Sequence, residues 1–197
     1  MFAEVLRRKL AGVCELPPGQ VEALRAHYEL LIRWNKVVNL TRVAGLEEAI
    51  ERHYCESIFA AMHLPESGSI ADVGSGAGFP GVPIAIVRPD CAVALIESHQ
   101  RKAAFLREAA RGVANLRVIA RRAEEVEERF DWVVSRAVRY SDIAEALQKL
   151  GQNAELLTGE VHVSDLAGFR WQDAIPMPWG DRRYLLLGTS VSRETNP

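Results

Sequence analysis

The sequence predicts an α/β fold in which a mostly parallel, twisted sheet is flanked by helices and preceded by a helical layer. From residue 66 onward, short apolar runs alternate with segments of helical periodicity, which is typical of parallel α/β proteins. Before residue 66, apolar residues recur at steps of three and four, which indicates helices. The chain has 197 residues, 48% hydrophobic and 25% charged, and is therefore long enough for one such domain.

The helical N-terminal layer is expected over residues 1–65. Apolar residues recur at helical spacing from Val21 to Asn35 and again from Ile50 to Met62. Pro17-Pro18 suits a helix start, because proline is tolerated at the first helical position. Turn-forming residues from Pro65 to Ser69 end the layer. We expect it to pack against the sheet, so that the chain forms one compact domain.

The core is expected over residues 66–197, where apolar runs have the length of strands and periodic segments have the length of helices. Strands are expected at residues 70–73, 91–96, 116–120, 131–135 and 155–163. Helices are expected between them, at residues 80–88, 99–113 and 141–150. A late strand at residues 184–187 is expected to run antiparallel. The alternation favours a parallel sheet, since parallel neighbours need long crossover connections.

Composition argues against several classes of protein. No run of about 18 apolar residues could span a bilayer, and the N-terminus carries Glu4 and lacks the apolar core of a signal peptide. We therefore expect a cytoplasmic protein that does not contact a membrane. Cys14, Cys55 and Cys91 match neither a disulfide framework nor a zinc site, so we expect reduced, mostly buried thiols and no metal centre.

Charge is distributed unevenly, although the net charge is only −2. The net value gives no global argument for nucleic acid and would equally suit a small-molecule enzyme. Between Ser98 and Arg122, however, basic residues predominate, and glutamates follow directly from Glu124 to Glu128. The basic residues are Arg101, Lys102, Arg107, Arg111, Arg117, Arg121 and Arg122. They could form a basic face or an ordinary solvated helix surface.

The strongest functional pattern is D-V-G-S-G-A-G-F-P-G, from Asp72 to Gly81. Gly74, Gly76 and Gly78 follow a predicted strand and precede a predicted helix, where the chain must turn sharply and let a ligand approach its backbone. Backbone amides at a helix start can also hydrogen-bond the polar groups of a ligand. The pattern therefore predicts a cofactor at this loop.

Two classes of cofactor fit the loop. Gly76 to Gly81 satisfies the dinucleotide pattern G-x-G-x-x-G, and Glu97 follows roughly twenty residues later. S-adenosylmethionine is favoured because Asp72 stands just before the first glycine, the glycines alternate from Gly74, and bulky Phe79-Pro80 crowd the position of a pyrophosphate. Our interpretation is a Rossmann-like fold of the class I S-adenosylmethionine-dependent methyltransferase type.

Two further positions complete the predicted cofactor site. Glu97 closes the second strand, where a carboxylate can accept hydrogen bonds from the ribose hydroxyls of either cofactor. Ala123-Glu124 follows the third strand, on the crevice side where an adenine would lie. The alternatives are a helix N-terminal charge for Glu97 and a solvated acidic turn for Glu124.

Several sequence blocks around the loop occur in a characteristic order. They are Trp34 to Thr41 (W-N-K-V-V-N-L-T), Arg52 to Ser57 (R-H-Y-C-E-S), Asp72 to Gly81, Glu97-Ser98 with Lys102, Phe105 and Leu106, Arg122 to Glu125 (R-A-E-E), and Ser135 to Ala137 (S-R-A). This series resembles the bacterial 16S ribosomal RNA guanine-N7 methyltransferases, the RsmG or glucose-inhibited division protein B family. The resemblance covers about residues 20 to 140 and is specific, because its first and last blocks lie outside the loop common to many methyltransferases.

The resemblance implies a reaction and a set of cofactor contacts. The reaction is methylation of N7 of the guanine at position 527 of 16S rRNA, so the partner would be 16S rRNA or the small ribosomal subunit, and we expect a monomer. The implied S-adenosylmethionine contacts are Gly74, Phe79, Ala123, Glu124 and Arg136. Two features depart from the family pattern: Glu56 stands where the family usually has aspartate, and the match fades after Leu150.

Methylation of guanine N7 needs no general base, because N7 carries an exposed lone pair. Catalysis would then depend on alignment and on exclusion of water. The candidate positioning residues are Arg136, His53 and Arg139, although His53 could equally be a packed core histidine. Trp34 is expected to fill the core. RNA contacts would come from Arg139 and most of the basic residues named above.

Three other functions stay open on sequence alone. A small-molecule methyltransferase would use the same loop and suit the nearly neutral net charge. A NAD-binding oxidoreductase depends on Gly76 to Gly81 alone. A catalytically idle RNA-binding or assembly protein would explain the faded C-terminal match.

Overall fold

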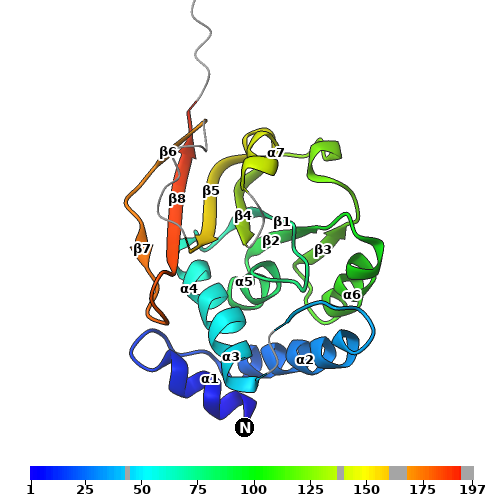
Figure 1. Cartoon of the computed structure of the whole chain (residues 1–197), viewed down its shortest axis with the longest axis vertical. Coiled ribbons are helices and arrows are strands. Elements are labelled where there is room, and N and C mark those ends of the chain that lie inside the picture. The colour runs from blue at the N-terminus through cyan, green and yellow to red at the C-terminus, as the bar shows by residue number, and fades with distance from the viewer. Residues whose placement is uncertain (43–44, 137–139, 160–167, 192–197) are drawn as a thin grey trace, which may run out of the picture.

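The structure is a computed structural model that describes residues 1–42, 45–136, 140–159 and 168–191. Its N-terminal helices are α1 (Phe2–Leu10), α2 (Pro18–Asn35), α3 (Leu46–Ala49), the π-helix η1 (Ile50–Cys55) and α4 (Glu56–His63). Figure 1 shows α1, α2 and α3 side by side at one end of the molecule. The predicted helices are present, and α2 begins at Pro18, where the two prolines predict a helix start.

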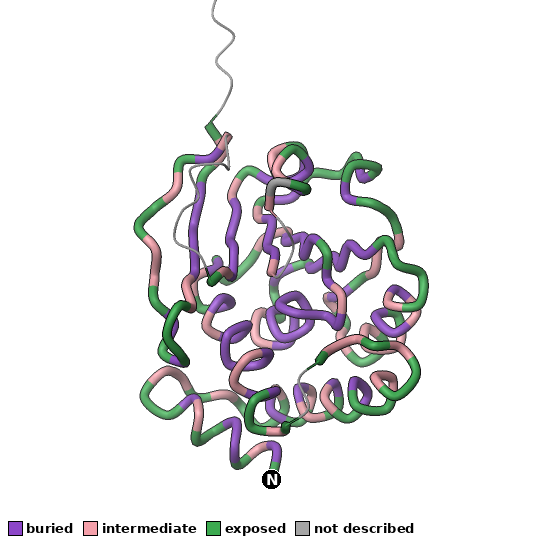
Figure 2. Tube along the Cα trace, in the orientation of Figure 1, coloured by how far each residue is buried: buried purple, intermediate pink, exposed green. Residues whose placement is uncertain are grey.

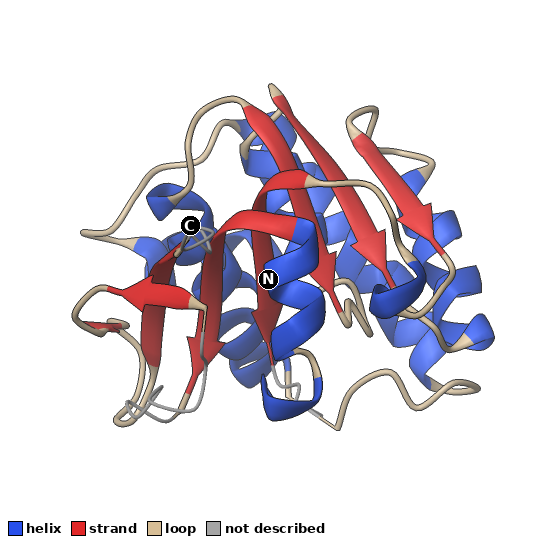
Figure 3. Cartoon of the chain, turned by 90° about the horizontal axis from the view of Figure 1, so that it is seen from above, coloured by secondary structure: helices blue, strands red, loops and turns tan. Residues whose placement is uncertain are grey.

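A mixed sheet forms the centre of the molecule. Within the described ranges its strand order is β3-β2-β1-β4-β5-β8-β6, and β7 pairs with β8. The strands are β1 (Gly68–Val73), β2 (Cys91–Ile96), β3 (Leu116–Ile119), β4 (Phe130–Arg136), β5 (Gly151–Thr158), β6 (Phe169–Trp171), β7 (Ile175–Pro176) and β8 (Tyr184–Ser190). β1 to β5 run parallel, and β8 runs antiparallel to β5 (Figure 3). The predicted mostly parallel sheet is confirmed.

The connections between the parallel strands are short helices. They are α5 (Gly81–Val87), α6 (Gln100–Ala110), α7 (Ala144–Leu150) and the 3-10 turns η2 (Ala123–Glu125) and η3 (Tyr140–Asp142). The prediction for β5 was wrong at its start, which is Gly151 rather than residue 155, because the polar pair Gln152-Asn153 interrupts the apolar pattern. Residues 160–163 of that predicted strand lie outside the described residues. The predicted helix over 141–150 is η3 followed by α7.

One apolar cluster joins the N-terminal helices to a face of the sheet. Leu6 of α1 and Leu24 of α2 are fully buried and belong to the same cluster as Leu95 of β2. On the other face, Leu147 of α7 packs in a second cluster with Val133 of β4. Figure 2 shows the buried segments concentrated in the strands and in the helices against them. Each leucine that is fully buried contributes about 1.5–3 kcal/mol to folding.

The strand order reverses between β1 and β4, since β2 and β3 lie on one side of β1 and β4 lies on the other. In open α/β sheets, ligands bind beyond the carboxyl ends of the strands at such a point. We therefore expect the ligand site among the loops that follow β1, β2, β4 and β5.

Cys55 and Cys91 are buried, Cys14 is half-buried, and these thiols are unpaired, as the spacing predicts. Among the described residues, no helix is long and apolar enough to cross a membrane.

Candidate functional site

The glycine-rich loop leaves β1 at its carboxyl end and turns into α5. Gly74 and Gly76 have φ angles of +76° and +57°, in the left-handed region that glycine adopts without steric cost. Gly78 is also required by packing, because a Cβ there would lie 2.6 Å from Cγ2 of Val82. The Gly74 amide donates to the Ile96 carbonyl of β2 at 3.0 Å. The loop is therefore a preformed turn that is tied to the neighbouring strand.

Asp72 lies under this loop and is fully buried in β1. Its Oδ2 accepts a hydrogen bond of 3.0 Å from the Gly81 amide at the start of α5. Burial raises the pKa of this carboxyl to about 7. The Asp72 side chain therefore braces β1 against α5, and a direct contact of Asp72 with a cofactor stays a prediction.

Glu97 lies at the end of β2, beside the glycine loop. Its Oε2 accepts from the Gly76 amide at 2.9 Å, and its Oε1 accepts from the His99 amide at 2.8 Å. A carboxylate can accept about four hydrogen bonds, so Glu97 keeps acceptor capacity. After β3, η2 begins with the buried Ala123 and the exposed Glu124. The fold thus places the predicted cofactor residues after three adjacent strands, at one edge of the sheet.

Phe79, the last residue of the loop before Pro80, lies at the centre of a cluster of rings. The His53 ring stacks on it, with centroids 4.6 Å apart and planes 18° from parallel. Tyr54 and His27 meet it edge to face, at 5.1 and 5.2 Å. The Phe79 ring is buried, so it joins the loop to the N-terminal helices. Because the ring is buried, the predicted contact of Phe79 with the cofactor would be made by its backbone atoms.

Arg136, at the end of β4, contacts two members of this ring cluster, Phe79 and His53. Its Cζ lies 5.3 Å from the Phe79 ring centroid, and its Nη2 lies 2.9 Å from Nδ1 of His53. Arginine only donates, so Nδ1 of His53 accepts and the ring proton is on Nε2, which lies 2.8 Å from Oγ1 of Thr41. Burial and the charges of Arg136 and Arg52 lower the His53 pKa to about 3. His53 is therefore a neutral link between Thr41 and Arg136.

The W-N-K-V-V-N-L-T block explains how Thr41 reaches this position. The Asn35 Oδ1 accepts from the amides of Leu40 and Thr41, at 2.8 and 2.9 Å, and its Nδ2 donates to the Thr41 carbonyl at 3.0 Å. Asn35 thereby closes the turn after α2. Trp34, which was expected to fill the core, is half-buried and packs against its margin: its ring meets Phe105, and its Nε1 donates to Glu108 at 3.0 Å.

Glu56, the first residue of α4, is a buried carboxylate between two arginines. Its Oε1 accepts from Nη1 of Arg183 at 2.8 Å, and its Oε2 lies 3.5 Å from Nη1 of Arg136. Burial raises the pKa of Glu56, while the positive charges of Arg136 and Arg183 act against that rise. Glu56 is the residue that departs from the family pattern, and its two carboxylate oxygens face the two cations.

A cavity of about 460 Å³ opens beside these residues. It is lined by η1, by the ends of β4 and β5, and by the connection into β8. Its charged lining residues are Arg52, Glu56, Arg136 and Arg183. The lining is therefore net positive, and the cavity adjoins the point where the strand order reverses.

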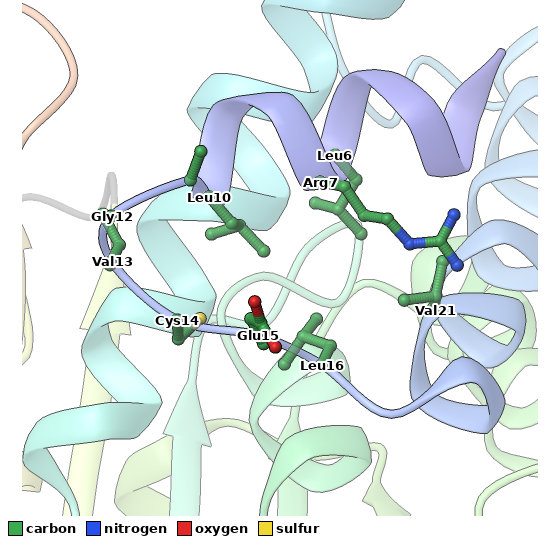
Figure 4. A pocket seen from close by; sticks show the side chains of 10 residues that line it. Leu6, Arg7, Leu10, Gly12, Val13, Cys14, Glu15, Leu16 and Val21 are labelled. Carbon is green, nitrogen blue, oxygen red and sulfur yellow. The ribbon is translucent and has the colours of Figure 1, made fainter.

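A second cavity, of about 630 Å³, lies in the N-terminal layer between α1 and the start of α2. Figure 4 shows its apolar side chains, among them Leu6, Leu10 and Leu16, with the half-buried Cys14 at its edge. It shares no lining residue with the predicted site. It is therefore separate from the predicted site.

The predicted RNA-contacting residues are mostly exposed. Lys102 is half-buried, and the exposed ones are Arg101, Arg107, Arg111, Arg121 and Arg122. Arg117 pairs with Glu128, so basic and acidic stretches contact one another across this surface. Arg139 lies outside the described residues.

Sequence reasoning missed Arg183, and it did not connect His27 with the loop. Arg183 is an isolated arginine in the segment where the family resemblance fades, and no local pattern marks it. His27 lies on α2, and a Cβ at Gly78 would approach its Nε2 to 3.3 Å. Both residues reach the site through tertiary contacts that no sequence spacing records.

Comparison with known proteins identifies the family. The family model described as rRNA small subunit methyltransferase G matches residues 20–159. A ribosomal RNA small subunit methyltransferase G from Methylobacillus flagellatus is 46% identical over 134 residues, which are 66% of this chain and 64% of the relative. One from Aromatoleum aromaticum is 38% identical over 166 residues, or 80% of this chain and 76% of the relative. The match to the first of these thus spans somewhat less than two thirds of its length.

Solved structures with the same fold are more distant in sequence. A SAM-dependent methyltransferase from Aquifex aeolicus aligns with a TM-score of 0.59 and 13% identity, over 82% of this chain and 98% of that one. A SAM-dependent O-methyltransferase from Thermotoga maritima aligns with a TM-score of 0.59 and 15% identity, over 84% and 73%. These likenesses show the Rossmann-like methyltransferase fold. Because the family model covers well over half of the chain, the chain belongs to the rRNA small subunit methyltransferase G family.

Proposed function

We propose that the chain is an S-adenosylmethionine-dependent methyltransferase that modifies N7 of a guanine in 16S rRNA, at position 527. The observation that carries the proposal is the family match over residues 20–159. The guanine and its position come from the family resemblance. The proposed partner is 16S rRNA, free or in the small ribosomal subunit, and the proposed enzyme is a monomer.

The carboxyl edge of the sheet suits this cofactor. Gly74 is exposed and has positive φ, so a ligand can approach the backbone closely. The remaining acceptor capacity of Glu97 fits two ribose hydroxyls, which are hydrogen-bond donors. We assign the other contacts to Gly76, Gly78, Phe79, Ala123, Glu124 and Arg136, with Asp72 acting through the shape of the loop.

When bound, S-adenosylmethionine supplies an electrophilic methyl group on sulfur. Guanine N7 is already a lone-pair acceptor, so no residue has to remove a proton from it first. The chain's own task is to hold the base in line and to exclude water. His53 suits a positioning role in such a reaction, because both of its ring nitrogens are engaged by Arg136 and Thr41.

The 460 Å³ cavity is the proposed acceptor pocket. It lies at the end of β4, on the side of Arg136 away from β2 and Glu97 in the strand order. Its net positive lining would attract the phosphates of RNA. A guanine can enter such a pocket when it is splayed out of a loop, because the major groove of an A-form duplex is too narrow for side chains.

The test uses labelled S-adenosylmethionine and 30S subunits from cells that lack the modification. We expect label on one guanine of 16S rRNA, located by mapping the modified base. Glu97→Gln should weaken cofactor binding in calorimetry by roughly ten- to a hundredfold, since one carboxylate hydrogen bond is worth roughly 1.5–3 kcal/mol. Glu66→Gln, in an exposed turn, makes the same charge change and should bind normally.

Three outcomes would contradict the proposal. The first is that the chain binds S-adenosylmethionine but transfers no label to 16S rRNA. The second is binding of NAD in place of S-adenosylmethionine in the calorimetric titration. The third is ribonuclease-insensitive methylation of a metabolite extract, which would identify a small-molecule enzyme.

A further inference from the structure

Arg183 enters the acceptor pocket from the loop between β7 and β8. A hydrogen bond of 2.9 Å from the Met177 amide to the Arg183 carbonyl closes this loop. Trp179 anchors its middle, because its Nε1 donates to the Lys9 carbonyl of α1 at 2.9 Å and its ring meets Phe59 of α4 edge to face at 6.1 Å. The backbone of Arg183 is therefore fixed relative to α1 and α4.

Arg183 and Arg136 share one buried carboxylate. Oε1 of Glu56 accepts from Arg183 at 2.8 Å, and Oε2 lies 3.5 Å from Arg136. The Glu56 side chain is 4% exposed, whereas those of Arg183 and Arg136 are 28% and 15% exposed. A carboxylate buried to this degree remains ionised only when cations face it. The position of Arg136 therefore depends on a charge that Arg183 helps to maintain.

Arg136 has further contacts that transmit this dependence. It donates through Nη1 to the Arg52 carbonyl of η1, and through Nη2 to His53. It also lies over Phe79 of the glycine loop. A change in the Glu56 charge would thus alter the residue that joins the cofactor loop to the acceptor pocket.

We propose that Arg183 is a positioning residue for methyl transfer, which holds Arg136 in place through the Glu56 carboxylate. The inference rests on the proposed function, because it concerns the same site. It gives the hairpin of β7 and β8, which lies beyond the segment matched by the family model, a role in the reaction. Its contribution is made through Glu56, in contrast to a residue that acts by touching RNA.

The test compares Arg183→Gln, Arg183→Lys, Glu56→Gln and the double variant with the unmodified chain. Arg183→Gln should lower kcat on 30S subunits by about tenfold or more, and this loss should exceed any rise in its Kd for S-adenosylmethionine, to which Arg136 is only one of several assigned contacts. Arg183→Lys should recover much of the loss, since an ammonium can still face Oε1. Arg170→Gln, at an exposed position of β6, removes the same charge and is the matched control.

Two readouts separate positioning from general structural support. If Arg183 acts through Glu56, the double variant should have the same kcat as Glu56→Gln, because the two changes break one interaction. In Arg183→Gln only Arg136 and Arg52 would still favour the Glu56 anion, so the pKa of Glu56 should rise. The acid limb of the pH profile of kcat should therefore move to higher pH. Thermal melts identify any variant that fails to fold. If Arg183→Gln is such a variant, Arg183→Lys is compared with the unmodified chain in its place.

Several results would overturn the inference. They are an unchanged kcat in Arg183→Gln, additive losses in the double variant, and a rise in KM for subunits with unchanged kcat, which would indicate a direct RNA contact. If the unmodified chain transfers no methyl group to 16S rRNA, the proposed function fails and this inference fails with it. If the unmodified chain is active and Arg183→Gln is equally active, only the inference fails.

Discussion

His53 and Thr41 show how much a single hydrogen bond can control in a buried site. The His53 Nε2–H has Thr41 Oγ1 as its partner, and the other ring nitrogen accepts from Arg136. His53 is 9% exposed, so water cannot easily replace a lost partner. The neutral tautomer is therefore part of the structure and does not need to change during the reaction.

Replacement of Thr41 by valine tests this link. Thr41→Val keeps the shape of the side chain and removes the hydroxyl, so the His53 N–H is left without that acceptor. We expect a loss of about 1–3 kcal/mol in the free energy of unfolding, measured by urea denaturation, together with a lower kcat. Thr41→Ser should restore both. Equal stability of the valine and serine variants would show that the hydrogen bond contributes nothing.

Asp72 gives a prediction for pH dependence. Its pKa is raised from 3.8 to about 7 by burial, so the folded state holds a proton that the unfolded state releases. The corresponding stability is complete below pH 3.8 and is lost as pH rises through 7. Asp72→Asn cannot ionise and can still accept from the Gly81 amide. Between about pH 4 and pH 8, we expect the free energy of unfolding of Asp72→Asn to rise by a few kcal/mol relative to that of the unmodified chain.

The measurement is urea denaturation of both proteins across this pH range. The difference between the two plots of unfolding free energy against pH isolates the effect of Asp72. The buried histidines are present in both proteins, and their lowered pKa values make stability rise with pH. Parallel curves would mean that Asp72 is ionised in the folded state throughout. The prediction would then be wrong.

Individual site residues could be predicted where a local pattern carries them. The glycines, Glu97 and Arg136 stand in motifs tied to strand ends, so their arrangement at one edge follows from the predicted topology. Arg183 could not be predicted, because its contact with Glu56 joins residues 127 positions apart in the chain. The burial of Asp72 was likewise not foreseen, since a motif gives the position of a carboxyl and not its exposure.

Among the structural elements, the loop between β1 and α5 is the one in which steric contacts predict different costs for the same substitution at two glycines. Gly78→Ala would place a Cβ 2.6 Å from Val82 and would also need positive φ, whereas Gly76→Ala meets nothing closer than 3.8 Å. The alanine at position 76 should cost about 1–2 kcal/mol from conformation alone, and the alanine at position 78 should cost clearly more. Thermal and urea denaturation of both variants check the order. The reverse order would show that the loop relaxes at Gly78.

The elements themselves were predicted to different degrees. β1, β2 and α2 follow directly from apolar runs and periodicity, and their bounds agree closely with the prediction. The π-helix η1 was expected as ordinary helix, because periodicity cannot separate the two over six residues. β6 and β7 were not predicted, since they are two or three residues long and exist through pairing with β8.

At the scale of the whole molecule, the N-terminal helices and the sheet share one core. Leu24 of α2 is fully buried within the cluster that includes the strands. Leu24→Ala should therefore cost about 2–5 kcal/mol and should lower the melting of helix and sheet signals together. Circular dichroism and tryptophan fluorescence should give one coincident transition. Two separate transitions would mean that residues 1–65 unfold as an independent unit.

The overall architecture was the most predictable level, because alternation and crossover rules leave few topologies for such a pattern. The sequence did not predict that the loop between β7 and β8 contacts α1. Trp179 bonds to the Lys9 carbonyl, and nothing local to either residue indicates that contact.

The two parts of the proposed site are synthesised at different times. β8 pairs along β5, and Arg183 precedes it, so both are made after the glycine loop and the parallel strands. A growing chain that has reached residue 158 holds every residue of the proposed cofactor site but lacks the last wall of the acceptor pocket. All residues assigned to the methyl donor are thus synthesised before Arg183, which completes the lining of the proposed acceptor pocket.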